Sequence, residues 1–471
     1  MNINEKTLTK TRSVLFLLLI ILAPLSKYPS FATPLFNFTS FRIGLYQLLA
    51  TAFIFSCLYG YNNKFIKSAK PVATGLMLIL LSVVVGLFFA INEARSLLLA
   101  TSLTMLVFLA FSSWLYVTKY LNRTLLKKAV KYSLYASILF SFLAILQFAF
   151  NTFSSEDLGI LCTNCTNTVF GFPRINLFAA EPQFLASSFI PFFFISLFMS
   201  IKYKTLLAKI SLTLVSLVIG LTFSRGAFLA IVVGLMFFVF SNLDFIKNNL
   251  RATLNTFVLI VLGFVISFSL LVASASIAYK ETPNIAYETT STMLEQLSLG
   301  VIKLPKKVSV VPERINPQNV EFVSPGLIEA STNERLSAAE LAINAWLYSP
   351  INVIFGTGIG NLGPFVDKYI EPSAPDNLTV YIFYILLASE LGVVGLIGLG
   401  IVLFYPLVLL IKKTHIYKFA GLQIVVAILA SFITQYLFFG SYINVVYIWF
   451  YIGVATALAG MSQKQLSKLF K

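Results

Sequence analysis

The sequence has little of what metal enzymes, redox enzymes and soluble domains are built from. It contains one histidine and three cysteines among 471 residues, and only 11% of its residues are charged. No cluster of His, Cys, Asp and Glu has the spacing of a metal site, which predicts chemistry without a metal. A soluble domain carries about 25% charged residues, so an ordinary soluble enzyme is excluded.

Long hydrophobic runs are what the sequence has instead. Hydrophobic residues make up 58% of it, and apolar stretches recur from residue 13 to residue 460. A helix crosses a bilayer with about 20 apolar residues, whereas the strands of a membrane barrel alternate. We therefore predict an all-α polytopic membrane protein with about twelve transmembrane helices. The predicted spans are 13–30, 41–60, 71–91, 96–117, 129–150, 181–200, 206–223, 227–241, 253–277, 380–411, 418–439 and 443–460.

The basic residues behind the net charge of +16 are distributed unevenly between the two sides of this topology. With the N-terminus inside, 22 of the 34 basic residues but only 2 of the 18 acidic ones lie in the inner segments. Lysine and arginine accumulate in cytoplasmic loops, so the bias predicts that both termini are cytoplasmic. The basic charge is thus a topology signal and gives no reason to expect nucleic acid as a partner. The first span lacks a small-residue cleavage pattern and is expected to be a signal anchor.

Three regions are predicted from these spans. Residues 1–277 form a bundle of about nine spans, residues 278–376 form a large extracytoplasmic loop domain, and residues 377–471 form a further three spans. The first part of the loop domain is rich in proline and is expected to be irregular. Its second part is expected to contain a helix near 332–348 that ends before Ser349-Pro350. The residues whose helical spacing predicts this helix are Leu336, Ala339, Ile343 and Leu347.

Three arginines are the main polar candidates, and all lie on the predicted outer side. Arg174 precedes the sixth span, Arg225 lies in the tight turn between the seventh and eighth spans, and Arg335 lies in the first turns of the loop helix. Guanidinium groups bind phosphates with two parallel hydrogen bonds. Together they predict a phosphate or pyrophosphate site at headgroup depth. The alternative for each arginine is a plain interfacial anchor.

The remaining motifs support weaker interpretations. Gly358-Ile-Gly360-Asn-Leu-Gly363 matches a dinucleotide fingerprint but lacks the preceding strand, so we interpret it as a turn that lets two backbones approach closely. Cys162 and Cys165 form either a local disulfide or two free thiols. His415 is expected in a solvated loop. Glu390 is the most deeply membrane-embedded acid. It is expected either to form a hydrogen bond to a neighbouring helix or to have a functional role.

The order of these motifs resembles the O-antigen polymerase and O-antigen ligase superfamily. The residues that carry the resemblance are Arg174, Glu181-Pro182, Ser224-Arg225-Gly226-Ala227, Arg335, Trp346, Ser349-Pro350, the segment 355–361 and Glu390-Leu-Gly392-Val-Val-Gly395. The similarity spans roughly 170–400. It implies a multi-pass protein of the bacterial inner membrane that needs no cofactor. Its implied partners are an undecaprenyl-pyrophosphate-linked glycan donor, a glycan acceptor, membrane lipids and a chain-length regulator.

The resemblance also implies roles for individual residues. Arg225 and Arg335 match the arginines that engage the donor pyrophosphate, and Arg174, Gly358 and Asn361 are further substrate-binding candidates. The general base that accepts a proton from the acceptor hydroxyl is expected to be Glu181, with Asp376 as the second choice. Alternatively, Glu181 is a helix N-terminal carboxylate that pairs with Arg174.

These observations lead to three hypotheses about function, two of them enzymatic and one not. Superfamily ligases carry a His-Asn pair shortly before the Glu-x-Gly segment, whereas this chain has Asp376-Asn377 at a longer spacing. The Glu-Pro motif at 181–182 is more similar to the motif of the superfamily's polymerases than to that of its ligases. We therefore predict a polymerase of lipid-linked oligosaccharide repeat units, with a ligase as the alternative. A transporter of polysaccharide or lipid-linked sugars is the alternative from a different class.

Overall fold

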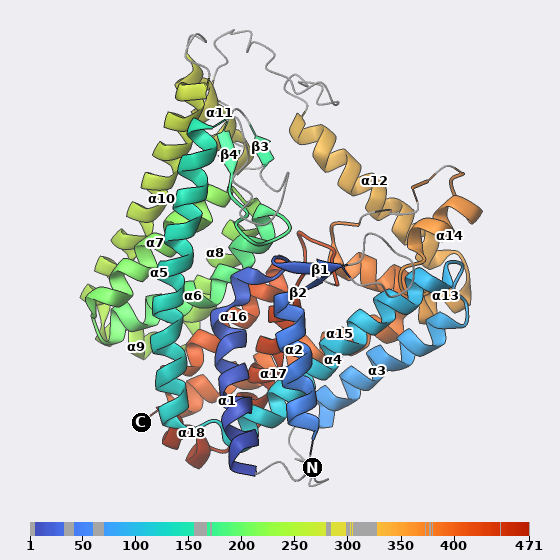
Figure 1. Ribbon diagram of the computed structural model, residues 1–471, viewed down its shortest axis with the longest axis horizontal. Coiled ribbons are helices and arrows are strands. Elements are labelled where there is room, and N and C mark those ends of the chain that lie inside the picture. Colours follow the sequence, from blue (N-terminus) through green and yellow to red (C-terminus); the bar gives the residue numbers. More distant parts are fainter. Residues whose placement is uncertain are drawn as a thin grey trace.

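The computed structural model describes residues 5–32, 42–59, 70–154, 167–169, 172–278, 284–297, 302, 304, 327–372, 374–375, 378, 380–442 and 444–470. Nearly all regular structure in these residues is helical, which confirms the all-α prediction (Figure 1). Every predicted span overlaps a helix, although the first one, 13–30, extends past the end of its helix at Ile21. These helices are α1 (Glu5–Ile21), α2 (Leu45–Leu58), α3 (Lys70–Leu87), α4 (Glu93–Tyr120), α5 (Arg123–Phe153), α6 (Pro182–Lys202), α7 (Leu206–Thr222), α8 (Arg225–Ser241), α10 (Leu250–Ala278), α15 (Phe383–Tyr417), α16 (Leu422–Gln435) and α17 (Val446–Gly460).

The predicted count of twelve spans is not confirmed. Among the described residues, six helices are long and apolar enough to cross a membrane, namely α3, α4, α5, α6, α10 and α15. A seventh is added if α17 and the short helix after it count as one broken span. The other apolar helices, α2, α7, α8 and α16, have 14 to 17 residues, fewer than the roughly 20 that a straight crossing needs. The chain is therefore a multi-pass membrane protein whose exact span number stays a prediction.

Short elements connect the long helices. They are η1 (Ala23–Leu25), β1 (Ser30–Ala32), β2 (Arg42–Gly44), β3 (Asn167–Val169), β4 (Phe172–Arg174), α9 (Leu243–Asn248), α11 (Ile285–Leu297), α12 (Leu327–Leu347), α13 (Pro350–Phe355), α14 (Leu362–Tyr369) and α18 (Gln463–Phe470). The strands form two antiparallel ribbons, β1 with β2 and β3 with β4. The second ribbon ends at Arg174, so it fixes the backbone of a predicted site residue.

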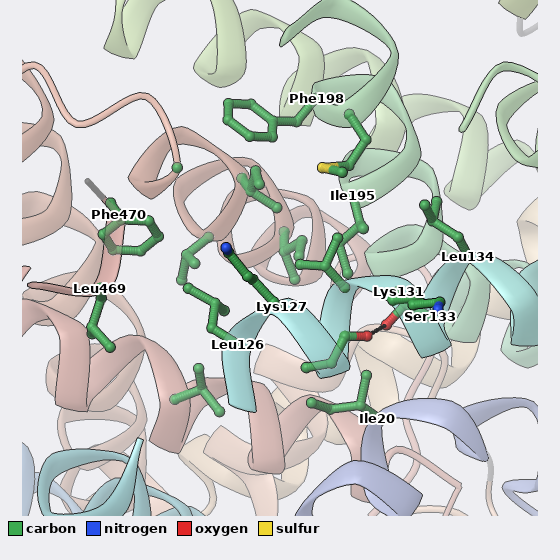
Figure 2. A pocket seen from close by; sticks show the side chains of 18 of the residues that line it. Ile20, Leu126, Lys127, Lys131, Ser133, Leu134, Ile195, Phe198, Leu469 and Phe470 are labelled. Atoms are coloured by element: carbon green, nitrogen blue, oxygen red, sulfur yellow. Dashed lines mark hydrogen bonds between the residues drawn. The ribbon is translucent and has the colours of Figure 1, made fainter. Parts of the chain in front are cut away.

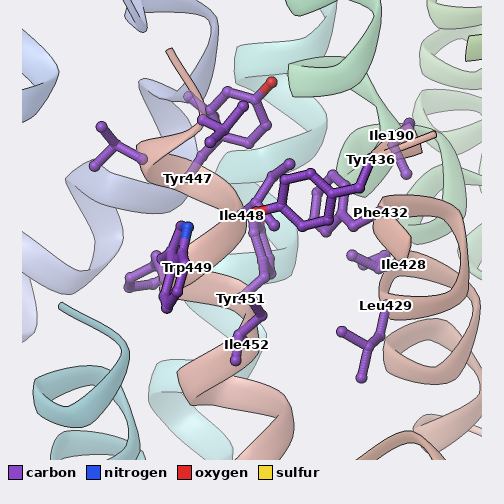
Figure 3. Close-up of a cluster of buried hydrophobic side chains, with 14 of the residues drawn as sticks. Ile190, Ile428, Leu429, Phe432, Tyr436, Tyr447, Ile448, Trp449, Tyr451 and Ile452 are labelled. Atoms are coloured by element: carbon purple, nitrogen blue, oxygen red, sulfur yellow. The ribbon is translucent and has the colours of Figure 1, made fainter. Parts of the chain in front are cut away.

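The core of the bundle lies where α6, α16 and α17 meet. Phe432, Tyr447 and Trp449 are fully buried there, and Figure 3 shows these rings together with aliphatic side chains from all three helices. The Phe432 and Tyr447 ring centroids are 6.0 Å apart. Offset and tilted aromatic pairs at such distances add to the energy of burial. This core holds the helices whose ends carry the candidate site.

The loop domain contains more helix than the sequence predicts. Residues 285–297, expected to be irregular, form α11, which packs against α10 with Thr289 and Met293 buried. No proline occurs between Pro283 and Pro305, so nothing interrupts the helix there. Other parts of the proline-rich stretch, including Pro312, lie outside the described residues.

The predicted helix near 332–348 is confirmed as α12, which begins at Leu327. Of the residues whose spacing predicts it, only Ala339 is buried, whereas Leu336 and Leu347 are 59% and 58% exposed. The buried face consists of alanines, and it packs against α13, α14 and α15. Small side chains let helix backbones approach closely, which is why this face is the buried one.

Labelling of single cysteines tests which side of the membrane each end of the molecule faces. Figure 1 places both chain termini at one end and the β3–β4 ribbon at the other. We expect an impermeant maleimide to label cysteines at Tyr348 and Tyr369 in intact cells, and cysteines at Tyr203 and Ile416 only after permeabilisation. All four side chains are at least 45% exposed, so burial does not protect them. Labelling of position 203 or 416 in intact cells would contradict the predicted orientation.

Candidate active site

Arg174 holds the turn between α7 and α8. Its Nε donates to the carbonyl oxygen of Thr222 at 2.9 Å and its Nη2 to that of Phe223 at 3.4 Å. Phe223 has a left-handed backbone with φ 47°, and it ends α7. The last carbonyls of a helix lack partners within the helix, and a guanidinium stabilises them through hydrogen bonds and charge. Arg174 thus uses two of its five N–H groups to fix the turn that precedes Arg225.

Arg225 opens α8 directly after this turn. The Ser224 side chain caps the helix by accepting from the amide of Ala227 at 3.4 Å. The adjacent Gly226 is in close contact with Phe438, since a Cβ built there would lie 2.6 Å from the Phe438 side chain. Arg225 itself is half-buried. A cation at a helix N-terminus adds to the partial positive charge of the helix dipole, which favours a bound anion.

Arg335 reaches the site from a distant part of the sequence. It lies on α12, and its guanidinium carbon is 4.6 Å from the centroid of the Tyr381 ring. Such cation–π contacts are worth about 0.5–1 kcal/mol at exposed positions. Tyr381 stands just before α15, so the contact orients Arg335 relative to that helix. No pattern in the sequence singles out Tyr381, because an aromatic residue at a membrane interface has no distinctive spacing.

The structure brings the three arginines within electrostatic reach of one another, and Glu181 within electrostatic reach of Arg174. The pKa of Arg174 is lowered to about 10, mainly by burial and also by the positive charges of Arg225 and Arg335, while the negative charge of Glu181 acts in the opposite direction. The charge of Arg335 also acts on Arg225. Arg174 remains protonated at neutral pH. Three positive charges facing one acid leave an excess of positive charge that a bound anion would neutralise.

Glu181 lies at the exposed start of α6. It is the residue before the first helical turn, but its side chain does not cap the helix. Its Oε2 instead accepts from the Nε2 of Gln183 at 2.6 Å. The carboxylate is exposed and close enough to Arg174 to raise the pKa of that arginine. A carboxylate in this position is open to a substrate hydroxyl.

The glycine-rich segment approaches the backbone of α15, as its interpretation as a close-contact turn predicts. The amide of Thr357 donates to the carbonyl oxygen of Ser389 at 2.8 Å, and that of Gly358 to the carbonyl oxygen of Glu390 at 3.1 Å. α15 is broken at Gly392, where φ is 64° and ψ is −168°. A Cβ on Gly356 would lie 2.2 Å from the Glu390 carbonyl carbon. Two backbones therefore meet at the break, and a side chain at Gly356 would push them apart.

Glu390 completes this junction. It is buried, and its Oε2 accepts from the Tyr442 hydroxyl at 2.8 Å. The backbone amides of Gly360 and Leu362 also hydrogen-bond to it. A buried carboxylate persists only when hydrogen bonds satisfy it, and these three donors do so. Glu390 therefore has the first of the two roles expected from the sequence, a hydrogen bond to another part of the bundle. Its partner Tyr442 was not predicted from the sequence.

Asn361 and Gly358 are also part of the scaffold. The Asn361 side chain is fully buried, and its Oδ1 accepts from the amides of Ile91 and Asn92, each at 2.9 Å. Its Nδ2 donates to the Ser96 hydroxyl at 2.5 Å. A Cβ on Gly358 would lie 2.6 Å from the carbonyl oxygen of Gly86. These contacts tie the loop to the α3–α4 turn, so they favour structural roles over the predicted glycan contacts.

Replacement of a glycine at the break in α15 should destabilise the protein. Gly392→Ala would place a Cβ 2.3 Å from the Ile354 backbone at a positive φ, and we expect it to lower the free energy of unfolding by more than about 3 kcal/mol. Gly400→Ala, eight residues later in the same helix, is the matched control, because nothing lies within 4 Å of its Cβ. The control should be neutral or stabilising. Thermal unfolding in detergent compares the two, and equal midpoints would contradict the expectation.

The other sequence candidates lie apart from this site or outside the described residues. Asp376, Cys162 and Cys165 belong to the undescribed positions. Cys57 is a buried free thiol in α2, and His415 is exposed near the end of α15. Within the described ranges, no group of three or more His, Cys, Asp or Glu residues could hold a metal ion. Metal independence therefore stays a prediction.

Part of the chain is similar to a known protein family. Residues 210–400 match the family model described as O-antigen ligase. No curated protein matches the chain. The matched region includes Arg225, Arg335 and the glycine-rich segment, whereas Arg174 and Glu181 precede it. Residues 210–400 are therefore similar to the O-antigen ligase family, whose members are membrane glycosyltransferases of the ligase and polymerase type.

Proposed function

We propose that this protein polymerises oligosaccharide repeat units that are linked to undecaprenyl pyrophosphate, at the outer surface of a bacterial inner membrane. The observation that carries the proposal is the cluster of Arg174, Arg225 and Arg335 next to the exposed carboxylate of Glu181. The family supplies the coarser class, a transfer of glycans from lipid-linked substrates. The cluster supplies the two chemical functions that such a transfer needs, an anion site and a proton acceptor.

In the proposed reaction, the bond between the donor sugar C1 and its pyrophosphate oxygen breaks. Negative charge then builds on the pyrophosphate, and Arg225 and Arg335 stabilise it with preorganised hydrogen bonds. The oxygen of the acceptor hydroxyl forms the new bond to C1 and gives its proton to Glu181. The products are a glycan longer by the transferred chain and free undecaprenyl pyrophosphate.

Each arginine has a separate part in this proposal. Arg225 adds its charge to the N-terminus of α8, and Arg335 is oriented by the Tyr381 ring. Arg174 acts as a positioning residue, because it holds the α7–α8 turn through the carbonyl oxygens of Thr222 and Phe223. The donor pyrophosphate would neutralise the excess positive charge, which gives the site its preference for a doubly charged group over a neutral sugar.

A ligase reaction is the second candidate, and the description of the matching family favours it. A ligase would transfer a finished glycan to a lipid or protein acceptor with the same donor chemistry. It differs from a polymerase in its acceptor and in the position of its base, for which Asp376 is the available carboxylate. The polymerase proposal rests on Glu181, which lies beside the arginines.

Purified protein with lipid-linked repeat units as the only glycan substrate tests the proposal. A polymerase should convert them into a ladder of longer chains on a gel, with release of undecaprenyl pyrophosphate. A ligase should leave single units until a separate acceptor is added. Unchanged substrate under both conditions, combined with movement of the substrate across a vesicle membrane, would instead support the transporter hypothesis.

The same assay tests the prediction that the reaction needs no metal. We expect the initial rate to stay unchanged in EDTA, because the proposed charge stabilisation comes from arginines and not from a cation. Addition of Mg²⁺ should then have no effect. Loss of activity in EDTA that Mg²⁺ restores would show that carboxylates such as Glu181 and Asp376 bind a metal during the reaction.

A further inference from the structure

A large apolar cavity lies at the end of the molecule opposite the arginine cluster. It has a volume of about 850 Å³ and is bounded by α1, α5, α6, α16, α17 and α18 (Figure 2). Pockets of about 300–1,000 Å³ with apolar linings are typical of sites for small molecules. Apolar side chains make up most of its wall, among them Ile20, Leu126, Ile195, Phe198, Ile428 and Phe470. The cavity shares no residue with the proposed active site.

The charged residues of the wall are all basic. Arg123, Lys127 and Lys131 follow one another along the first turns of α5, and Lys202 stands at the end of α6. Figure 2 shows Lys127 and Lys131 among the apolar side chains of the cavity. No acidic residue lines this pocket, and no ion pair of these four residues occurs in the described part of the chain. The cavity therefore combines an apolar interior with uncompensated positive charge.

A short helix with one apolar and one basic face, α18, closes one side of the cavity. α18 turns away from α17 by 119°. Its Leu466 and Leu469 are buried, whereas Lys464 and Lys468 are exposed. The apolar face of α18 is thus covered by the protein itself, whereas its basic face is exposed. Phe470, the last residue of α18, lines the cavity, so this helix forms part of the cavity wall.

We propose that this cavity binds an anionic phospholipid, with an acyl chain among the apolar side chains and the phosphate between Arg123, Lys127, Lys131 and Lys202. The apolar walls argue against a free anion such as inorganic phosphate, which gains nothing from them. The basic residues without acidic partners argue against a zwitterionic lipid, whose positive headgroup they would repel. Basic pockets between transmembrane helices on the cytoplasmic side bind anionic headgroups for the same reason. The site is independent of the proposed transferase reaction.

Native mass spectrometry of the full-length protein in detergent tests this proposal. We expect phosphatidylglycerol to remain bound at one copy under conditions that remove phosphatidylcholine with identical acyl chains. High salt should weaken retention of phosphatidylglycerol, because exposed charges are screened over about 3 Å at 1 M ionic strength. Phosphatidylglycerol should also raise the thermal unfolding midpoint, since a ligand that binds only the folded state stabilises it. Equal retention of the two lipids would overturn the proposal.

A pair of variants locates the headgroup. Lys127→Gln combined with Lys131→Gln should weaken phosphatidylglycerol binding by roughly thirtyfold, about fivefold for each lost charge. Lys128→Gln combined with Lys412→Gln removes the same charge from exposed residues that do not line the cavity, and it should bind like the unchanged protein. Both variants replace exposed side chains, so folding is not at risk. Equal weakening by both pairs would indicate general attraction to the membrane and would also overturn the proposal.

Discussion

Arg225→Lys and Arg335→Lys are each expected to abolish polymer synthesis while the protein stays at its normal level in the membrane. Lysine keeps the positive charge but loses the planar fork that holds two oxygens of a pyrophosphate at once. Loss of one preorganised donor lowers kcat by about 10²–10³. Purified variants with lipid-linked repeat units give the rate, and an immunoblot of membranes gives the protein level.

Two further arginine variants separate catalysis from anchoring. Arg251→Lys is the control, because Arg251 is exposed on the opposite side and an anchor tolerates lysine. Arg174→Lys should differ from the control and from Arg225→Lys and Arg335→Lys. It loses the hydrogen bonds to the carbonyl oxygens of Thr222 and Phe223, so it should lower the unfolding midpoint as well as the rate. Normal polymer from both Arg225→Lys and Arg335→Lys would refute their assignment to the pyrophosphate.

Glu181→Gln should lower the initial rate by about 10²–10⁴, the usual effect of losing a general base. Glutamine has the same size and can still bond to Gln183, so the start of α6 should be unchanged. The rate with lipid-linked repeat units, measured at saturating substrate, gives the effect on the chemical step. The unfolding midpoint should stay the same, which distinguishes loss of the base from loss of the fold.

Two further substitutions serve as controls for Glu181→Gln. Gln183→Ala removes the partner of the carboxylate without removing the base, and Asp376→Asn removes the only other candidate; each should cost little. A large effect of Asp376→Asn with a small effect of Glu181→Gln would favour the ligase-type site. If neither carboxylate matters, the departing pyrophosphate or water accepts the proton, and the arginines alone carry the catalysis.

The sequence predicts the helices well because the signal is local. Apolar runs indicate helices, and each of the twelve predicted spans overlaps a helix. The predicted number of membrane crossings is not confirmed, because α2, α7, α8 and α16 have 14 to 17 residues, fewer than the roughly 20 that a straight crossing needs. The sequence also misassigns residues 285–297, because nearby prolines suggest an irregular chain although none falls within α11.

The sequence by itself determined the class of the protein, the three arginines and the acidic residue beside them, because charges that are rare in a membrane protein stand out by type and position. Only the tertiary structure decided what each polar side chain does. Arg174 and Arg225 look equivalent in the sequence, yet Arg174 binds the end of α7 while Arg225 opens α8. The Glu390–Tyr442 bond joins residues 52 positions apart in the chain. Such pairings depend on which helices pack together, and no local pattern of residues records that.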